Sequence, residues 1–168
     1  MAREDAVVFH HILLATDFSD ASERALELAA GLARAVGARV TVLHVCETSQ
    51  ASSPATARVA ERTWPRAIRA RTEIERAVDR LRARGVSAEG ALRFGLLPER
   101  IVEIAREIGA DLVVTGTHAR KGLERFWYRS VAEEFLRHSP IPVLAAVPRE
   151  RDDELPCEPA NVVQLRRR

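Results

Sequence analysis

The sequence predicts an α/β domain in which helices cover an open parallel sheet. Short, almost continuous apolar runs alternate with longer segments of helical period, a pattern typical of parallel strands joined by crossover helices. With 168 residues, of which 46% are hydrophobic, the chain is also long enough to bury one sizeable core. We place the domain in residues 1–148, followed by a charged tail over 149–168 that lacks a sustained period and is expected to be mobile.

The first strand is expected in the apolar run from Val7 to Ala15. A helix follows, which Asp20 can cap and Gly37 ends, and its apolar face is expected to hold Ala25, Leu28, Ala29, Leu32 and Val36. Val40 to Val45 is the second predicted strand. Thr48 to Pro65 is rich in Ser, Ala and Thr and is predicted to be a surface loop.

The second half continues the alternation. A charged helix over 66–84 has an apolar stripe formed by Ile74, Val78 and Leu81. The remaining predicted elements are a strand from Val86 to Phe94, a helix with Pro98 in its first turn that ends at Gly109, a strand from Asp111 to Thr115, a helix from Ser130 to His138, and a fifth strand from Val143 to Val147.

Composition and residue spacing argue against several classes of function. The 26 basic and 24 acidic residues leave a formal net charge of +2, which argues against a general nucleic-acid binder. No signal-peptide pattern and no apolar run of about 18 residues appears, so we expect a cytoplasmic protein without a membrane partner. Cys46 and Cys157 form neither a disulfide framework nor a zinc spacing, and the five histidines show no metal-ligand spacing.

The carboxyl ends of the predicted strands are the expected ligand site, because parallel α/β sheets bind ligands outside these ends. Thr16 and Asp17, Val45 and Cys46, Gly95, and Gly116 come from four parts of the chain and should meet there. The strand that ends at Gly116 is followed by a loop and a helix that starts at Ser130. A loop and a helix N-terminus in this order favour a bound phosphate.

Five segments resemble the universal stress protein family in order and spacing over roughly residues 8–148. They are Ala15-Thr-Asp-Phe-Ser-Asp20, Leu43-His-Val45, Gly95 with Pro98, Asp111-Leu-Val-Val-Thr-Gly-Thr-His118, and Ser130-Val-Ala-Glu133 with Pro140-Ile-Pro-Val-Leu144. The resemblance implies a Rossmann-like sheet of five strands in the order 3-2-1-4-5 and a homodimer. Some members of the family bind ATP and others do not.

The resemblance also implies a set of nucleotide-binding residues. Binding members carry a glycine, two residues, a second glycine, nine residues, and a third glycine followed by Ser or Thr. Here these places hold Gly116, Ala119, Arg129 and Ser130, so two glycines are replaced. The whole set expected to contact a nucleotide is Ala15, Thr16, Asp17, Val45, Gly116, Thr117, His118, Ala119, Arg129, Ser130 and Val131.

Several of these residues also have an interpretation that needs no bound nucleotide. Asp17 lies near base and ribose in the family, yet together with Ser19 it can cap the turn after the first strand. The backbone of Val45 can hydrogen-bond adenine, but a plain core valine fits equally well. Arg129 can supply paired N–H donors to an anion, or it can fill the phosphate space and exclude the nucleotide.

Two functions therefore stand side by side. The first is a cytoplasmic stress-response regulator that binds an adenine nucleotide, which is ATP together with Mg. This function needs no catalytic group, and its activity is at most slow hydrolysis of ATP. The second is a nucleotide-free dimeric interaction protein in which Ala119 and Arg129 have abolished ATP binding, with Phe126-Trp127-Tyr128 as a contact surface for a protein partner. In both, the apolar fifth strand lies at the sheet edge, and pairing with a second copy would cover it.

Overall fold

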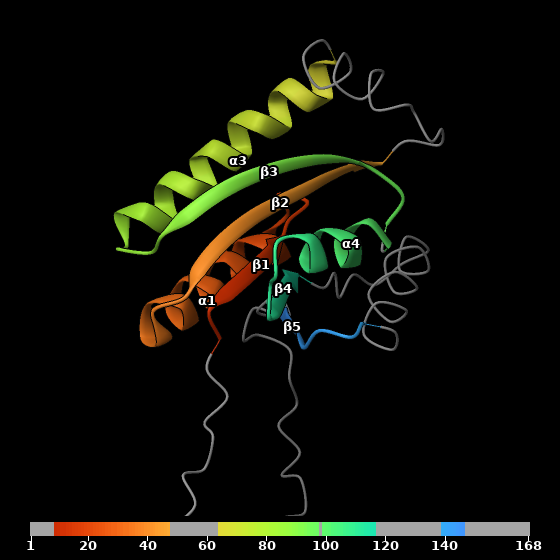
Figure 1. The fold of residues 1–168 in the computed structure, drawn as a ribbon. Coiled ribbons are helices and arrows are strands. Elements are labelled where there is room, and N and C mark those ends of the chain that lie inside the picture. Colours follow the sequence, from red (N-terminus) through yellow and green to blue (C-terminus); the bar gives the residue numbers. More distant parts are fainter. Residues whose placement is uncertain (1–8, 48–63, 98, 117–138, 147–168) are drawn as a thin grey trace, which may run out of the picture.

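A computed structural model describes residues 9–47, 64–97, 99–116 and 139–146. These residues form one parallel sheet of five strands in the order β3-β2-β1-β4-β5, which confirms the predicted order (Figure 1). The elements in chain order are β1 (His11–Ala15), α1 (Asp20–Val36), β2 (Arg39–Glu47), α3 (Pro65–Ala83), β3 (Ala88–Gly95), α4 (Glu99–Glu107), β4 (Leu112–Gly116) and β5 (Val143–Ala146).

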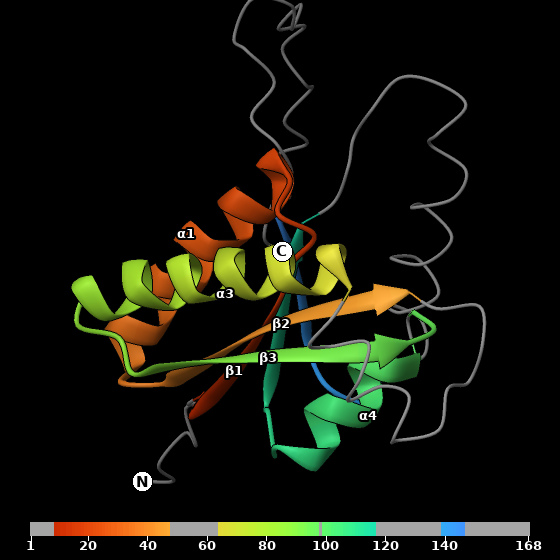
Figure 2. The same ribbon diagram turned by 90° about the horizontal axis from the view of Figure 1, so that it is seen from above.

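The sheet separates two apolar clusters. Helices α1 and α3 lie on one face, and α4 lies on the other (Figures 1 and 2). Successive strand residues point to opposite faces, so Ile12 and Leu14 pack toward α1 and α3 while Leu13 packs toward α4. All three side chains are fully buried. Burial on both faces explains why the strands read as continuous apolar runs.

The ends of α1 differ in part from expectation. Gly37 ends the helix as predicted, in the left-handed conformation at φ 74°. The N-cap, however, is Ser19 and not Asp20, because the Ser19 side chain accepts a hydrogen bond from the Ser22 N–H. Asp20 is the first helical residue, where its charge still favours the positive end of the helix dipole.

The buried face of α1 is also rotated from the predicted one. Leu28 and Val36 are each 38% exposed. Ala25 and Ala29 of the predicted face are fully buried, and Leu32 packs against the core in part. The buried positions of the helix are the small and medium residues Ala21, Ser22, Ala25, Leu26, Ala29, Ala30 and Ala33. A face built mainly of alanine lets α1 lie close to the sheet, whereas larger side chains on that face would hold it away.

The later elements match their predictions with small shifts. Helix α3 begins at Pro65, one residue earlier than predicted, with this proline in its first turn. Its predicted apolar stripe of Ile74, Val78 and Leu81 is buried. Helix α4 begins at Glu99. The predicted helix over 130–138, the loop over 48–63, Pro98 and the tail over 149–168 lie outside the described residues. No helix among the described residues is both long and apolar enough to cross a membrane.

An exposed group of ion pairs joins α1 to α3. Arg84 donates to both carboxylate oxygens of Glu27 at 2.6 and 2.8 Å, and Arg80 binds Glu23 at 2.6 Å and Glu27 at 3.2 Å. The hydrogen bond from Arg84 is the main reason that the pKa of Glu27 lies below its ordinary value. Since these side chains are 40–52% exposed, each pair contributes at most about 1 kcal/mol.

A buried histidine sits at the amino end of the sheet, opposite the expected site. His11 is 3% exposed, and its Nδ1 lies 3.1 Å from the Ile108 carbonyl oxygen, which can only accept. Its Nε2 lies 2.8 Å from Thr41 Oγ1, which in turn lies 3.1 Å from a Glu89 carboxylate oxygen. Burial, and then the charge of Arg39, lower the pKa of His11.

Candidate functional site

The described strand ends meet at one edge of the sheet, as the sequence predicts. Ala15 at the end of β1 pairs with Leu43 on one side and with Thr115 on the other. Strands β2 and β3 continue beyond this level, to the pair formed by Glu47 and Gly95. The carboxyl edge therefore has a step, because β1 and β4 stop while β2 and β3 run on (Figure 1).

Asp17 organises the turn between β1 and α1. Its Oδ1 accepts three hydrogen bonds, from the Ser19 N–H at 3.0 Å, the Ser19 hydroxyl at 2.6 Å and the Ser22 hydroxyl at 2.6 Å. The Asp17 N–H in turn donates to Ser22 Oγ at 3.1 Å. The structural interpretation of Asp17 as a capping residue together with Ser19 is thus confirmed, and Ser22 is an additional member that sequence analysis missed.

Phe18 and His44 form a second unit in this turn. Phe18 has a φ of 62°, a left-handed conformation that costs a residue other than glycine about 1–2 kcal/mol. Its ring stacks on that of His44, with centroids 4.6 Å apart and planes 28° from parallel. Such a pair contributes about 0.5–1.5 kcal/mol, which offsets much of the backbone cost.

Thr16 holds the same unit through its main chain and its side chain. Its carbonyl oxygen lies 2.8 Å from His44 Nδ1, so Nδ1 carries a proton, and its Oγ1 accepts from the Phe18 N–H at 3.0 Å. The contact between Phe18 and His44 could not be predicted from the sequence, because the two residues are far apart in the chain and no local pattern links them.

The side chain and the backbone of Val45 face different surroundings. Its side chain is 9% exposed and packs in the apolar cluster beneath α4, as a plain core valine would. The direction of the Val45 backbone follows from two hydrogen bonds between β2 and the chain of β1. The Arg39 N–H donates to the His10 carbonyl, and the Leu43 carbonyl accepts from the Thr16 N–H. Odd-numbered residues of β2 therefore turn their backbone groups toward β1. Val45 follows this rule beyond the end of β1, so its N–H and C=O point into the step.

Gly116 ends β4 in direct contact with the first turn of α1. A Cβ at this position would lie 2.5 Å from the Ala21 carbonyl carbon, 2.6 Å from the Ser22 nitrogen and 2.7 Å from the Ala21 oxygen. These are backbone atoms and cannot rotate away. The fold of this chain thus requires glycine at position 116 for helix packing, whatever else the residue does.

Cys46, near the end of β2, is a free cysteine. It is partly buried against the cluster formed with α1 and α3, and burial raises the pKa of its thiol, with Arg66 opposing the shift. A partly buried cysteine of this kind packs as a small apolar residue. Within the described parts of the chain, no three His, Cys, Asp or Glu side chains gather as metal ligands.

Several predicted site residues cannot be placed relative to this edge. Thr117, His118, Ala119, Arg129, Ser130 and Val131 all lie outside the described residues, as does Phe126-Trp127-Tyr128. Of the predicted set, the structure brings together Ala15, Thr16, Asp17, Val45 and Gly116. A groove of about 500 Å³ between α3 and β3 shares none of these residues.

Comparison with known proteins gives a consistent result. A sequence model of the universal stress protein family matches residues 9–147. A Staphylococcus aureus protein that carries the universal stress protein name is 31% identical over 156 residues, which cover 90% of each chain. A universal stress protein from Archaeoglobus fulgidus in complex with dAMP is 28% identical, with a TM-score of 0.60 over 83% of this chain and 99% of that one. A universal stress protein in complex with cAMP is 26% identical, with a TM-score of 0.67 over 85% of this chain and 100% of the other.

Proposed function

Because this chain belongs to the universal stress protein family, we propose that it binds an adenine nucleotide in the step at the carboxyl edge of its sheet. In this proposal it acts in the cytoplasm as a nucleotide-dependent regulator of a stress response. The backbone of Val45 carries the proposal. It presents one donor and one acceptor beside each other where β1 has ended, and the edge of an adenine ring offers the complementary pair.

The turn after β1 supports this placement of the nucleoside part of the ligand. The turn from Thr16 to Ser19 lies beside the end of β2, where Thr16 bonds to Leu43 and His44. The hydrogen bonds within the turn hold it in place without a ligand. A site whose groups are fixed in advance loses less entropy on binding. Two similar structures contain dAMP and cAMP, which supports an adenine nucleotide as the ligand class.

In this proposal the loop that follows Gly116 binds the phosphates of the nucleotide. Ser130 supplies a hydroxyl and an N–H group there, and Arg129 supplies a guanidinium in place of the family's third glycine. Mg would accompany ATP by neutralising the charge between its phosphates. No residue is assigned a catalytic role.

Calorimetric titration of nucleotide-stripped protein tests the proposal, with Mg-ATP and AMP measured in parallel. We expect micromolar binding of at least one of them. An Arg129→Gly variant reports on the altered loop, and Arg151→Gly, which removes the same charge from the tail, is the matched control. Silence to millimolar nucleotide in the natural protein, together with strong binding by Arg129→Gly, would reject the proposal.

A nucleotide-free interaction protein is the second candidate, and the contacts of Asp17 and Gly116 favour it. Asp17 is engaged by Ser19 and Ser22, and Gly116 is required by the contact with α1. Both residues therefore have reasons to be present without a nucleotide. This function would be supported if the natural protein binds no nucleotide and captures a specific protein partner.

We also propose that the protein is a homodimer joined through β5. This strand lies at one edge of the sheet and pairs with β4 along residues 143–146. An uncovered edge strand is a template for strand addition, and antiparallel pairing with β5 of a second copy would cover it. Light scattering at micromolar concentration should give twice the chain mass, and a monomer would contradict the proposal.

A further inference from the structure

Strand β3 forms the other edge of the sheet, and half of its backbone groups face outward. The Val40 N–H donates to the Ser87 carbonyl at 2.8 Å. Because parallel strands alternate, odd-numbered residues of β3 bond to β2, whereas Ala88, Gly90, Leu92 and Phe94 turn their N–H and C=O away from the sheet. An edge of this length invites another strand to add to it.

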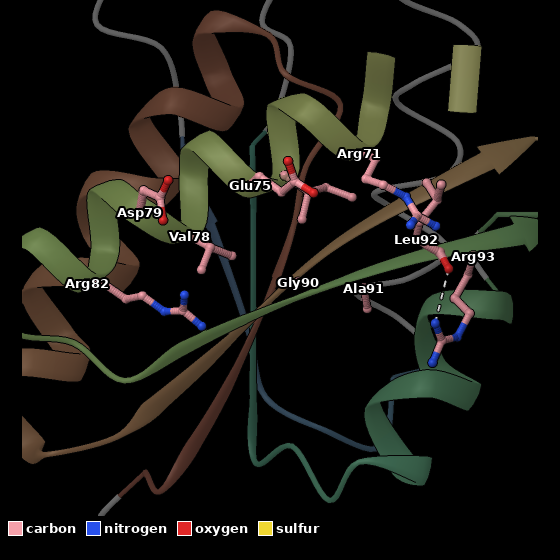
Figure 3. Close-up of a pocket in the computed structure, with 10 residues that line it drawn as sticks. Arg71, Glu75, Val78, Asp79, Arg82, Gly90, Ala91, Leu92 and Arg93 are labelled. Atoms are coloured by element: carbon pink, nitrogen blue, oxygen red, sulfur yellow. Dashed lines mark hydrogen bonds between the residues drawn. The ribbon is translucent and has the colours of Figure 1, made fainter. Parts of the chain in front are cut away.

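Two arginines occupy outward carbonyls of this edge. Arg82 Nε donates to the Ala88 carbonyl oxygen at 3.1 Å. Arg93 Nη1 donates to the Leu92 carbonyl oxygen at 3.0 Å (Figure 3). The two carbonyls are four residues apart, about 13 Å along a strand. An incoming strand would direct its own N–H groups at the same two acceptors, where the guanidinium groups already lie.

Charges along the groove between α3 and β3 add a second obstacle to self-association. Arg82 lies at one end, Arg71 and Arg93 lie at the other, and Glu75 and Asp79 line the helix side between them (Figure 3). A second copy that paired antiparallel about Gly90 would set Arg82 of one chain beside Arg93 of the other. It would also bring the two acidic segments together, and like charges in such proximity oppose association.

We propose that Arg82 and Arg93 shield the β3 edge, so that a second copy of this chain cannot extend the sheet there. Extension is then restricted to the opposite edge, at β5. The shielding is independent of nucleotide binding and of whether β5 forms a dimer, because it concerns a different edge of the sheet. Charged side chains that block an edge are a known means by which proteins avoid indefinite strand addition.

The test compares the natural protein with an Arg82→Ala/Arg93→Ala double variant by light scattering over a wide concentration range. We expect the double variant to grow beyond the mass of the natural protein as concentration rises. Loss of each arginine hydrogen bond to the β3 edge should lower the concentration at which association begins by on the order of tenfold. Hydrogen exchange at the outward amides of Gly90 and Leu92 should slow in the associated state.

The matched control is Arg69→Ala/Arg76→Ala, which removes two exposed charges from α3 without touching the outward carbonyls of β3. It should keep the mass of the natural protein. Circular dichroism establishes that each variant is folded, and the single variants Arg82→Ala and Arg93→Ala provide the test if the double variant is not. A folded variant that keeps the natural mass at every concentration would overturn the proposal, as would equal growth of the control.

Discussion

Replacement of Gly116 by alanine should destabilise the fold by displacing the first turn of α1. The added Cβ would meet the Ala21 carbonyl carbon at 2.5 Å and the Ser22 nitrogen at 2.6 Å. Both distances fall short of ordinary van der Waals contact by about 1 Å, and a packed interior has no space to absorb the difference. Overpacking of this kind costs about 1–3 kcal/mol, and we expect the upper end because backbone must move.

Gly31→Ala provides the matched control. Gly31 lies within the same helix, and a Cβ there would meet no atom within 4 Å. Alanine at a helix interior is favoured over glycine by about 0.5–1 kcal/mol, so this variant should be slightly more stable than the natural protein. The two substitutions are chemically identical and should shift stability in opposite directions.

Urea unfolding followed by circular dichroism measures both variants. The midpoint for Gly116→Ala should fall with an unchanged slope, whereas that for Gly31→Ala should rise. If Gly116→Ala unfolds at the natural midpoint, the close contact between β4 and α1 does not govern this position. Its presence would then need a different explanation, such as approach of a ligand.

Three other substitutions test separate features. Gly90→Ala should cost about 1–3 kcal/mol because its Cβ would clash with Ile74 Cγ2, and combination with Ile74→Ala should cost less than the sum of the single changes in urea unfolding. Glu27→Gln should cost no more than about 1 kcal/mol, and the loss should shrink at high salt. The lowered pKa of His11 means that the unfolded chain binds its proton more readily. Stability should therefore fall as pH drops below about 6.5, and His11→Gln should flatten that slope; an equal slope would contradict the buried-histidine account.

The sequence was sufficient for the architecture because each strand is buried on both faces. Residues such as Leu13 and Val113 have no exposed side, so the strands appear as uninterrupted apolar runs between helices. The buried face of α1 was harder to predict. Leu28 and Val36 are more apolar than Ala30 and Ala33, yet the small residues face the sheet, because close packing selects size as well as hydrophobicity.

The candidate site was predictable in position but not in its internal contacts. Alternation of strands and helices was enough to place Thr16 and Gly116 near one edge. The bonds of Asp17 to Ser22 and the stacking of Phe18 on His44 depend on a left-handed residue in a turn, which no periodic pattern specifies. The role of Gly116 in packing was missed for a related reason, since the glycine pattern suggests a ligand before it suggests a neighbouring helix.

The contact between Gly116 and α1 bears on how such a protein changes over generations. Selection for a folded chain is by itself enough to retain this glycine, so a lineage that abandoned nucleotides would keep it. Glycines that serve only a bound phosphate have no such protection and drift once the ligand is lost. Gly116 therefore indicates descent from the family but not nucleotide binding. Positions 119 and 129 are the ones at which loss of nucleotide binding would be visible as a substitution.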